Sequence, residues 1–151
     1  MYQFRLARQS DLVAIVRLLA DDDLGSAREI TSDPVDARYL SAFAAIESDA
    51  NQLLAVAIDP SDRVVGCLQL SFIPGLSRTG MWRGQIESVR VARDVRGSGL
   101  GSAFVEWAVG QCAARGCSLV QLTSDKTRAD SIRFYERLGF VASHEGLKRS
   151  L

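Results

Sequence analysis

Residues 93–101 carry the residue types and the spacing of an anion-binding loop. Glycines at positions 97, 99 and 101 lie between an apolar run at 85–91 and a helical pattern that begins near Leu100. Glycine permits backbone conformations and a close approach of a ligand that side chains prevent, and unpaired N–H groups at a helix N-terminus favour an anion. Arg96 adds a cation beside the first glycine. The segment predicts a pyrophosphate site, with an ordinary strand-to-helix turn as the alternative.

Glycine-rich loops of other kinds need a different spacing. A P-loop continues with lysine and then serine or threonine, but Gly101 is followed by Ser102 and Ala103. A dinucleotide loop reads G-x-G-x-x-G with an acid about 20 residues on, whereas this chain reads G-x-G-x-G with only Asp125 near that distance. The remaining pattern, arginine at 96 and glycines at 99 and 101 after a strand, resembles the coenzyme A loop of the GNAT superfamily of N-acetyltransferases. The resemblance implies an acetyl-CoA site that includes Arg96, Gly97, Ser98, Gly99, Leu100 and Gly101.

A second motif, at residues 131–140, resembles the F-Y-x-x-x-G-F signature that closes GNAT domains. It predicts a helix that ends at Gly139, where glycine takes the left-handed conformation at little cost. The resemblance implies that Ser131 lies at the cofactor and that Tyr135 protonates the departing thiolate, since a phenol of pKa about 10 is still protonated at neutral pH. The alternative for Tyr135 is a core aromatic with its hydroxyl at the surface. The chain departs from the broad pattern at Arg128 and Ser131, where many relatives carry Asn and Ala.

Glu87 is a carboxylate in the middle of a predicted strand, where strand propensity explains it poorly. A solvated glutamate on an exposed sheet face, or one paired with Arg83 or Arg90, is one interpretation. The other is a general base, because a primary amine of pKa about 10.4 is almost wholly protonated at neutral pH, a handicap of about 4 kcal/mol. In the resemblance, Glu87 aligns with the strand that places such a base in diamine acetyltransferases. The backbone of Val89 and Val91 is then expected to pair with the pantetheine arm.

Composition limits the classes of function. Eighteen basic and eighteen acidic residues balance, so no overall field points to nucleic acid or to an anionic membrane. No apolar run approaches the roughly 20 residues of a membrane span, and the first residues lack the apolar core of a signal peptide. Three cysteines and one histidine lack metal-ligand spacing, so no metal is expected. We expect a cytoplasmic protein in which Cys67 and Cys112 are buried thiols.

The hydrophobic pattern predicts one domain of mixed α/β class over residues 1–151. A first helix is expected after Ser10 as its N-cap. The further expected helices are 34–48, 100–115 and 128–138. The expected strands are 2–8, 52–58, 64–73, 85–91 and 119–124, with one or two more in 140–151. The strand–helix–strand passage over 85–124 predicts one parallel pair, so the central sheet is expected to be mixed, mostly antiparallel and flanked by helices.

The two motifs together predict an enzyme that moves an acetyl group from acetyl-CoA directly to a primary amine of a small molecule or peptide. Glu87 is the predicted base and Tyr135 the predicted acid, with no acyl-enzyme. A GNAT-like domain that binds an acyl-CoA as a regulatory or interaction module, without turnover, is the alternative. A nicotinamide or nucleotide enzyme is opposed by the glycine spacing.

Three features leave alternatives open. The acidic run at 21–23 is either a lip that attracts a cationic amine or a frayed helix end. Either one of Lys126, Arg128 and Arg133 meets the 3′-phosphate of coenzyme A, or all three lie on a solvated helix face. Neither the identity of the amine nor the pairing of two copies as a homodimer follows from the sequence.

Overall fold

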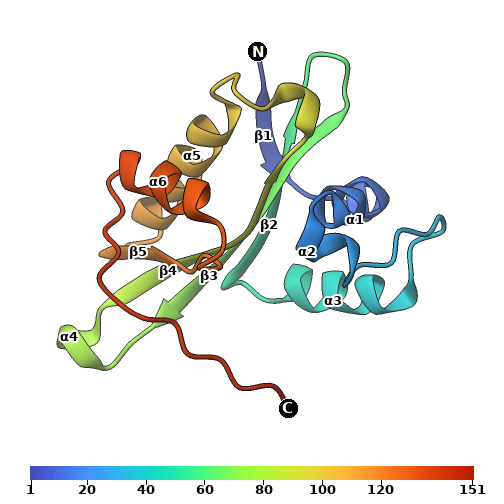
Figure 1. Cartoon of the computed structure of the whole chain (residues 1–151). Helices are drawn as coiled ribbons and strands as arrows, with labels where there is room; N and C mark the ends of the chain where they lie inside the picture. The colour runs from blue at the N-terminus through green and yellow to red at the C-terminus, as the bar shows by residue number, and fades with distance from the viewer.

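The computed structural model describes all 151 residues and contains one five-stranded sheet in the order β1-β2-β3-β4-β5. The strands are β1 (Gln3–Leu6), β2 (Gln52–Ile58), β3 (Val64–Pro74), β4 (Trp82–Val91) and β5 (Leu119–Leu122). Successive strands from β1 to β4 pair antiparallel, and β5 pairs parallel with β4. Helices α1, α2 and α3 lie on one side of the sheet, and α5 and α6 on the other (Figure 1). The predicted mixed sheet flanked by helices is confirmed.

The first helix, α1 (Leu12–Ala20), follows a 3-10 turn at Gln9–Asp11. The prediction of Ser10 as its N-cap is wrong, because Asp11 takes that position. The Asp11 carboxylate is buried, accepts a 2.7 Å hydrogen bond from the Arg8 backbone N–H, and pairs with both terminal nitrogens of Arg5. A carboxylate is favoured at a helix N-terminus, and this one also ties β1 to α1.

Two further helices follow before the second strand. The short helix α2 (Asp23–Ser26) was not predicted; Asp22 caps it by accepting a hydrogen bond from the Gly25 N–H. The helix α3 (Ala37–Ser48) begins after Asp36, whose carboxylate accepts from the Arg38 N–H at 2.9 Å. Side-chain oxygens before a helix satisfy N–H groups that have no partner inside it.

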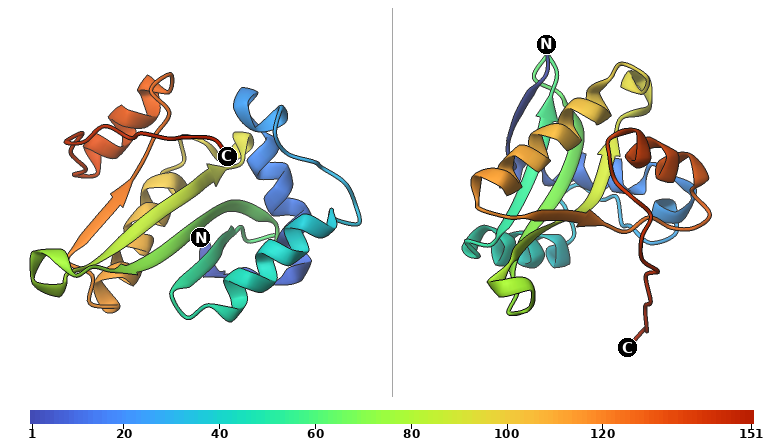
Figure 2. Two further views of the ribbon diagram at one scale, coloured as in Figure 1. Left: turned by 90° about the horizontal axis from the view of Figure 1, so that it is seen from below. Right: turned by 90° about the vertical axis from the view of Figure 1, so that its left-hand side faces the viewer.

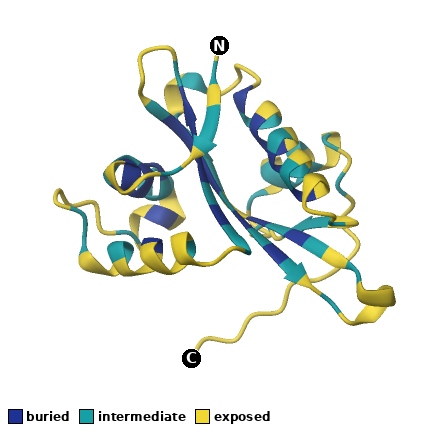
Figure 3. Cartoon of the chain, turned by 180° about the vertical axis from the view of Figure 1, so that it is seen from behind, coloured by how far each residue is buried: buried dark blue, intermediate teal, exposed yellow.

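The larger hydrophobic core lies between the sheet and α5 (Leu100–Ala114), whose buried side chains pack on alternate residues of β2, β3 and β4. The α5 residues in this core are Leu100, Phe104, Val105, Ala108 and Cys112. Gly84 of β4 is required here, because a Cβ on it would overlap the Cys112 sulfur. Figure 3 shows the buried stripe of α5 turned toward the strands.

A smaller core covers part of the opposite face. Residues of α1 and Phe43 of α3 pack there on Val56, Ile58 and Cys67 of β2 and β3. The predicted burial of Cys67 and Cys112 is confirmed, and burial raises the pKa of Cys67 to about 12 and that of Cys112 to about 11.

Strand β4 changes its pairing halfway along its length. Its register with β3 shifts between Cys67 and Gln69, where Ser88 has a φ of 57°, so the strand carries a bulge. β5 pairs with β4 only from Arg83 to Ile86. Beyond Ile86 the edge of β4 on that side has no neighbouring strand, and the sheet opens there.

The end of the chain differs from the prediction. No strand follows α6 (Ala129–Arg137), and residues 140–151 form an exposed extended coil (Figure 2). Val141, Leu147 and Leu151 are each more than 80% exposed, and of this segment's large apolar residues only Phe140 packs against the core. The segment between the strands expected at 64–73 and 85–91 contains a short turn, α4 (Ser77–Gly80), and β4 starts earlier than expected. No helix of the protein has both the length and the apolar character needed to span a bilayer.

Candidate active site

The glycine loop leads from β4 through a 3-10 turn (Arg93–Val95) into α5. Gly97 and Gly99 have φ values of 79° and 85°, a region that favours glycine. From Arg96 to Ser102, the backbone N–H groups without a hydrogen-bond partner are those of Gly97, Gly99, Gly101 and Ser102. Four free donors at the N-terminus of a 15-residue helix fit a pyrophosphate.

A pocket of about 460 Å³ opens beside this loop, between β4, α5 and α6. Tyr135 lines it together with most of the residues predicted to bind the cofactor, namely Val89, Val91, Arg96, Gly97, Gly99, Gly101 and Ser131. Of the other two predicted residues, Ser98 lies exposed in the same loop, and Leu100 is only 1% exposed in the core. Leu100 therefore has only its backbone to offer a ligand.

Two backbone carbonyls on the β4 edge that borders this pocket accept hydrogen bonds from arginine side chains. Arg90 Nη1 donates to the Val89 oxygen at 3.0 Å, and Arg96 Nε donates to the Val91 oxygen at 3.1 Å. A pantetheine arm bound to this edge as an added strand would replace both guanidinium groups. Arg96 would then be free to meet the phosphate in the neighbouring loop.

Tyr135 is held on α6 by aromatic neighbours. Its ring meets Phe134 and Phe140 edge-on, with centroids 5.0 and 5.8 Å away. Burial raises the pKa of Tyr135, and the positive charges of Arg90 and Arg128 oppose that rise. The hydroxyl is therefore protonated at neutral pH, which is the form that a general acid requires.

Glu87 lies outside this pocket, on the other face of the sheet. Ile86 points into the α5 core, so the alternation of β4 turns Glu87 away from α5. Its side chain is exposed, and its residue pairs across the sheet with Gln69 of β3. No salt bridge or side-chain hydrogen bond involves Glu87, so it pairs with neither Arg83 nor Arg90. The alternative of a solvated glutamate on an exposed sheet face fits this position as the general base does. Beyond Ile86, β5 no longer pairs with β4, so no strand adjoins that edge next to Glu87.

Two of the three acids after α1 pair with arginines, and the third, Asp23, is exposed, so the run is not simply a frayed helix end. Asp21 pairs with Arg93 at 2.8 Å, and Asp22 lies 2.7 Å from Arg128 and 3.6 Å from Arg90. Burial raises the pKa of Asp22, but a backbone N–H of α2 and the two arginines lower the same pKa by more, leaving it below its ordinary value. Asp22 thus links the α1–α2 junction to β4 and α6.

The basic residues expected near the 3′-phosphate also have carboxylate partners. Lys126 pairs with Glu145 at 2.7 Å, Arg133 pairs with Asp130, and Arg128 is held by Asp22. Lys126 and Arg133 are therefore paired at the surface, and Arg128 is paired with the α1–α2 junction.

Two arginines that the sequence did not single out as site residues lie near Tyr135 or in its pocket. Arg137 lines the pocket with Arg96, and neither has a carboxylate partner. Arg90 lies between Asp22 and Tyr135, and its Nε is buried without a hydrogen-bond partner. From sequence, Arg137 reads as a cation stabilising the last turn of a helix, and Arg90 as an ordinary strand arginine.

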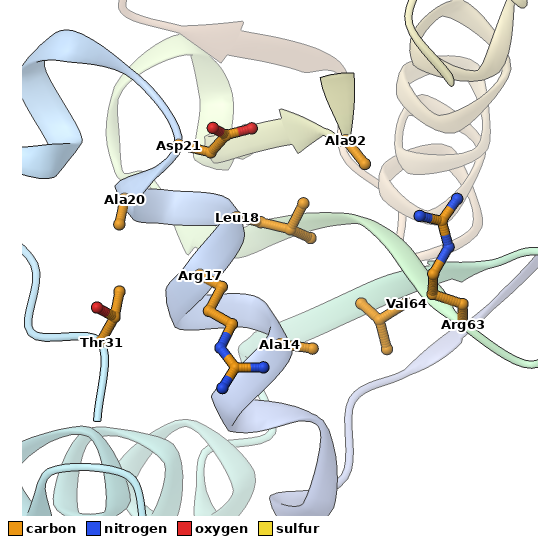
Figure 4. A pocket seen from close by; sticks show the side chains of 9 residues that line it. All are labelled: Ala14, Arg17, Leu18, Ala20, Asp21, Thr31, Arg63, Val64 and Ala92. Carbon is orange, nitrogen blue, oxygen red and sulfur yellow. The ribbon is translucent and has the colours of Figure 1, made fainter. Parts of the chain in front are cut away.

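A second hollow, of about 580 Å³, lies between α1 and the adjoining ends of β3 and β4 (Figure 4). Arg17, Asp21 and Arg63 line it with small and aliphatic side chains, and none of the predicted site residues does. It has no free N–H cradle. No group of three or more histidine, cysteine, aspartate or glutamate side chains is placed to hold a metal ion.

Comparison with known proteins agrees with this geometry. Residues 12–140 match the acetyltransferase (GNAT) family. A glucosamine 6-phosphate N-acetyltransferase of Trypanosoma brucei brucei is 31% identical over 149 residues, covering 94% of this chain and 99% of the relative. An aminoalkylphosphonate N-acetyltransferase of Salmonella typhimurium is 30% identical over 113 residues, covering 75% of this chain and 72% of the relative.

A solved structure is similar over its whole length. It is described as a transcriptional regulator from Bacillus halodurans C-125, is 46% identical, covers 100% of both chains, and superimposes with a TM-score of 0.96. The family match spans most of the chain, and both curated relatives are N-acetyltransferases. This chain therefore belongs to the acetyltransferase (GNAT) family, whose members use acetyl-CoA, and its activity is the transfer of an acetyl group to an amine.

Proposed function

We propose that this enzyme acetylates the primary amine of a small molecule that also carries an anionic group, with Glu87 as base and Tyr135 as acid. The observation that carries the proposal is the arrangement around β4. The free N–H cradle and Tyr135 share one pocket on the α5 side, and Glu87 stands on the other side of the same strand, where the sheet opens.

The α5 side receives acetyl-CoA in this proposal. The four free N–H groups and Arg96 bind the pyrophosphate, and Arg137 meets a further phosphate. The pantetheine arm lies along the unpaired edge at Val89 and Val91, which brings the thioester to the opening beside Glu87.

Glu87 prepares the nucleophile. Only about one molecule in a thousand of an amine with pKa about 10.4 is neutral at pH 7.4, and only the neutral form has a lone pair for attack. An unpaired, exposed carboxylate at the opening accepts that proton directly or through a water molecule. The lone pair then attacks the thioester carbonyl without an acyl-enzyme.

Tyr135 completes the reaction by donating its phenolic proton to the coenzyme A sulfur as the carbon–sulfur bond breaks. The raised pKa keeps that proton in place until the thiolate forms. None of the three cysteines lines the pocket, and the pKa of each is raised, so no thiolate competes as nucleophile.

The anionic group on the acceptor is inferred from two observations. The substrates named for the curated relatives, glucosamine 6-phosphate and an aminoalkylphosphonate, join an amine to a phosphorus oxyanion. In this chain, Arg90 and Arg128 stand beside Tyr135 and share the single carboxylate of Asp22. A substrate oxyanion would compete with Asp22 for these two cations.

The test is thiol release from acetyl-CoA by the purified protein with a panel of amines. Phosphorylated and phosphonated amines should react with higher kcat/KM than their neutral counterparts, and added chelator should leave the rate unchanged. Equal rates on charged and neutral amines would remove the anionic group from the proposal, and no release with any amine would remove the catalytic assignments. The cytoplasmic setting stays a prediction from the sequence, which leaves a homodimer open.

The second candidate is an acyl-CoA-binding regulatory module without turnover. The similar structure described as a transcriptional regulator favours it. A candidate base and a candidate acid on either side of β4, Glu87 and Tyr135, count against it, as does a net charge of zero, which gives no field for DNA. In the thiol-release assay, this candidate predicts acetyl-CoA binding with no product.

A further inference from the structure

A row of four polar side chains crosses the sheet on the face that carries Glu87. Gln52 pairs in register with Ser71, Ser71 with Gln85, and Gln85 with Gln121, so the row runs through β2, β3, β4 and β5. All four residues are partly buried. In the neighbouring row, Gln69 stands opposite Glu87. The opposite face of these strands is apolar core.

Central strands of a sheet are normally rich in branched and aromatic residues, and glutamine has no preference for them. On this same face, β2 and β3 carry Val56 and Cys67 beneath α1 and α3, in a row that continues to Arg90 of β4. Along β2 and β3 the side chains of this face then change from apolar to polar toward Gln52 and Ser71. Packing of the helices therefore does not account for the row.

The side chains of the row are only half satisfied within the protein. The Gln52 Oε1 accepts from Ser71 Oγ at 2.9 Å and from Gln69 Nε2 at 3.1 Å, and Gln121 Nε2 donates to Gln85 Oε1 at 2.8 Å. These bonds leave the amide nitrogens of Gln52 and Gln85 and the amide oxygens of Gln69 and Gln121 without protein partners. These amides therefore present both free hydrogen-bond donors and free acceptors, and the hydrogen bonds among them fix their orientation.

We propose that this polar row, Gln52–Ser71–Gln85–Gln121, binds hydroxyl groups of the acceptor, so that the acetylated amine belongs to a polyhydroxylated small molecule of the amino sugar type. A hydroxyl both donates and accepts, which matches an array of free amide nitrogens and oxygens. The inference rests on the proposed function, because the row serves an acceptor whose amine lies at Glu87.

The experiment compares two acceptors that both carry an amine and a phosphorus oxyanion. Glucosamine 6-phosphate has hydroxyl groups, and 2-aminoethylphosphonate has none. The test variants are Gln85→Met and Gln121→Met, which keep the length of the side chain and remove the amide. Gln3→Met, on the exposed strand β1, is the matched control.

In the test variants, kcat/KM for glucosamine 6-phosphate should fall roughly 5- to 50-fold, mainly through KM. The kcat/KM for 2-aminoethylphosphonate and the KM for acetyl-CoA should hold steady, and the control should match the wild type. If a methionine variant melts several degrees lower, Gln85→Asn and Gln121→Asn, which withdraw the amide by one methylene, replace it. An equal loss for both acceptors, or no loss for either, overturns the inference and leaves the proposed function standing.

Binding is measured separately, as the thermal shift that glucosamine 6-phosphate causes in the presence of coenzyme A. One outcome is a shift in the wild type that Gln85→Met abolishes, while no amine is turned over. This outcome supports binding of hydroxyl groups by the polar row and refutes the proposed function. Absence of both the shift and turnover with glucosamine 6-phosphate in the wild type overturns the inference.

Discussion

The two faces of the sheet build their chemistry in different ways. On the α5 face, the proposed cradle for pyrophosphate comes from consecutive residues, 97–102, and Tyr135 and Arg137 of one helix line the same pocket. On the face of α1 and α3, Glu87, Gln69 and the polar row come from four strands and meet only through sheet register. The first face offers fixed backbone donors that suit one invariant ligand, whereas the second offers side chains, which can vary without changing the backbone. We expect the cofactor to depend on the first face and the acceptor on the second.

The largest effect is expected at the loop. Gly99→Glu forces a side chain into φ 85° and brings a negative charge to the phosphate cradle. Acetyl-CoA at 100 times its dissociation constant should raise the melting temperature of the wild type by about 5–10 °C, and the variant should show no rise. The control is Gly110→Glu, an exposed glycine of α5 with open space around it. A rise of the same size in Gly99→Glu would exclude this loop as the cofactor site.

Tyr135→Phe should lower kcat across the pH range by roughly 100- to 10,000-fold, the range for a lost proton transfer. Its thermal shift with acetyl-CoA should be nearly that of the wild type, because the ring keeps its contacts with Phe134 and Phe140. Tyr39→Phe, far along the chain in α3, is the control for loss of a phenol. Normal turnover by Tyr135→Phe would assign the acid role to water or another group.

Glu87→Gln should cut kcat/KM by roughly 10- to 100-fold at pH 7. Raising the pH toward the pKa of the amine should restore part of the rate, because the free amine then forms without a base. The pH–rate profile is the measurement, with Glu106→Gln on the exposed side of α5 as control. A loss that is constant with pH would mean that Glu87 positions the acceptor and does not remove its proton.

The smallest effect is expected at Asp22, which neutralises the two arginines on the acceptor face. Asp22→Asn keeps an oxygen to cap α2 and frees Arg90 and Arg128, so KM for a phosphorylated amine should fall a few-fold at low salt and less at high salt. The variant should lose about 1 kcal/mol of stability at pH 7. Asp23→Asn, exposed and without an arginine partner, is the control.

The stability effect of Asp22 also has a defined pH dependence. The pKa of Asp22 is lowered in the folded protein. Its contribution to stability is therefore complete above the unfolded value of about 3.9 and is lost as pH falls through the folded value. The difference in melting temperature between wild type and Asp22→Asn should be constant from pH 7 to about 5 and should narrow below about pH 4. A difference that grows on acidification would contradict the ion-pair account.

The contrast between the faces also explains what could be predicted from sequence. The glycine loop and the Tyr135 helix were found because their residues are adjacent in the chain, and strand 52–58 was predicted with its true ends. The polar row was not found, because Gln52, Ser71, Gln85 and Gln121 become neighbours only when the register is known. Asp22 looked like a poor helix end, because its partner Arg128 lies 106 residues away. The strands expected at 140–151 did not form. A strand needs a neighbouring strand to pair with, and the local sequence pattern does not reveal whether one is within reach.

The most direct test of the two-sided account is the initial-rate pattern with both substrates varied, together with mass analysis of the protein after exposure to acetyl-CoA alone. If cofactor and acceptor occupy opposite faces and meet at the opening beside Glu87, both must be bound before transfer. The account predicts intersecting double-reciprocal lines and an unmodified chain. Parallel lines, with an acetylated chain after exposure to acetyl-CoA alone, would show a covalent intermediate and contradict direct transfer across β4.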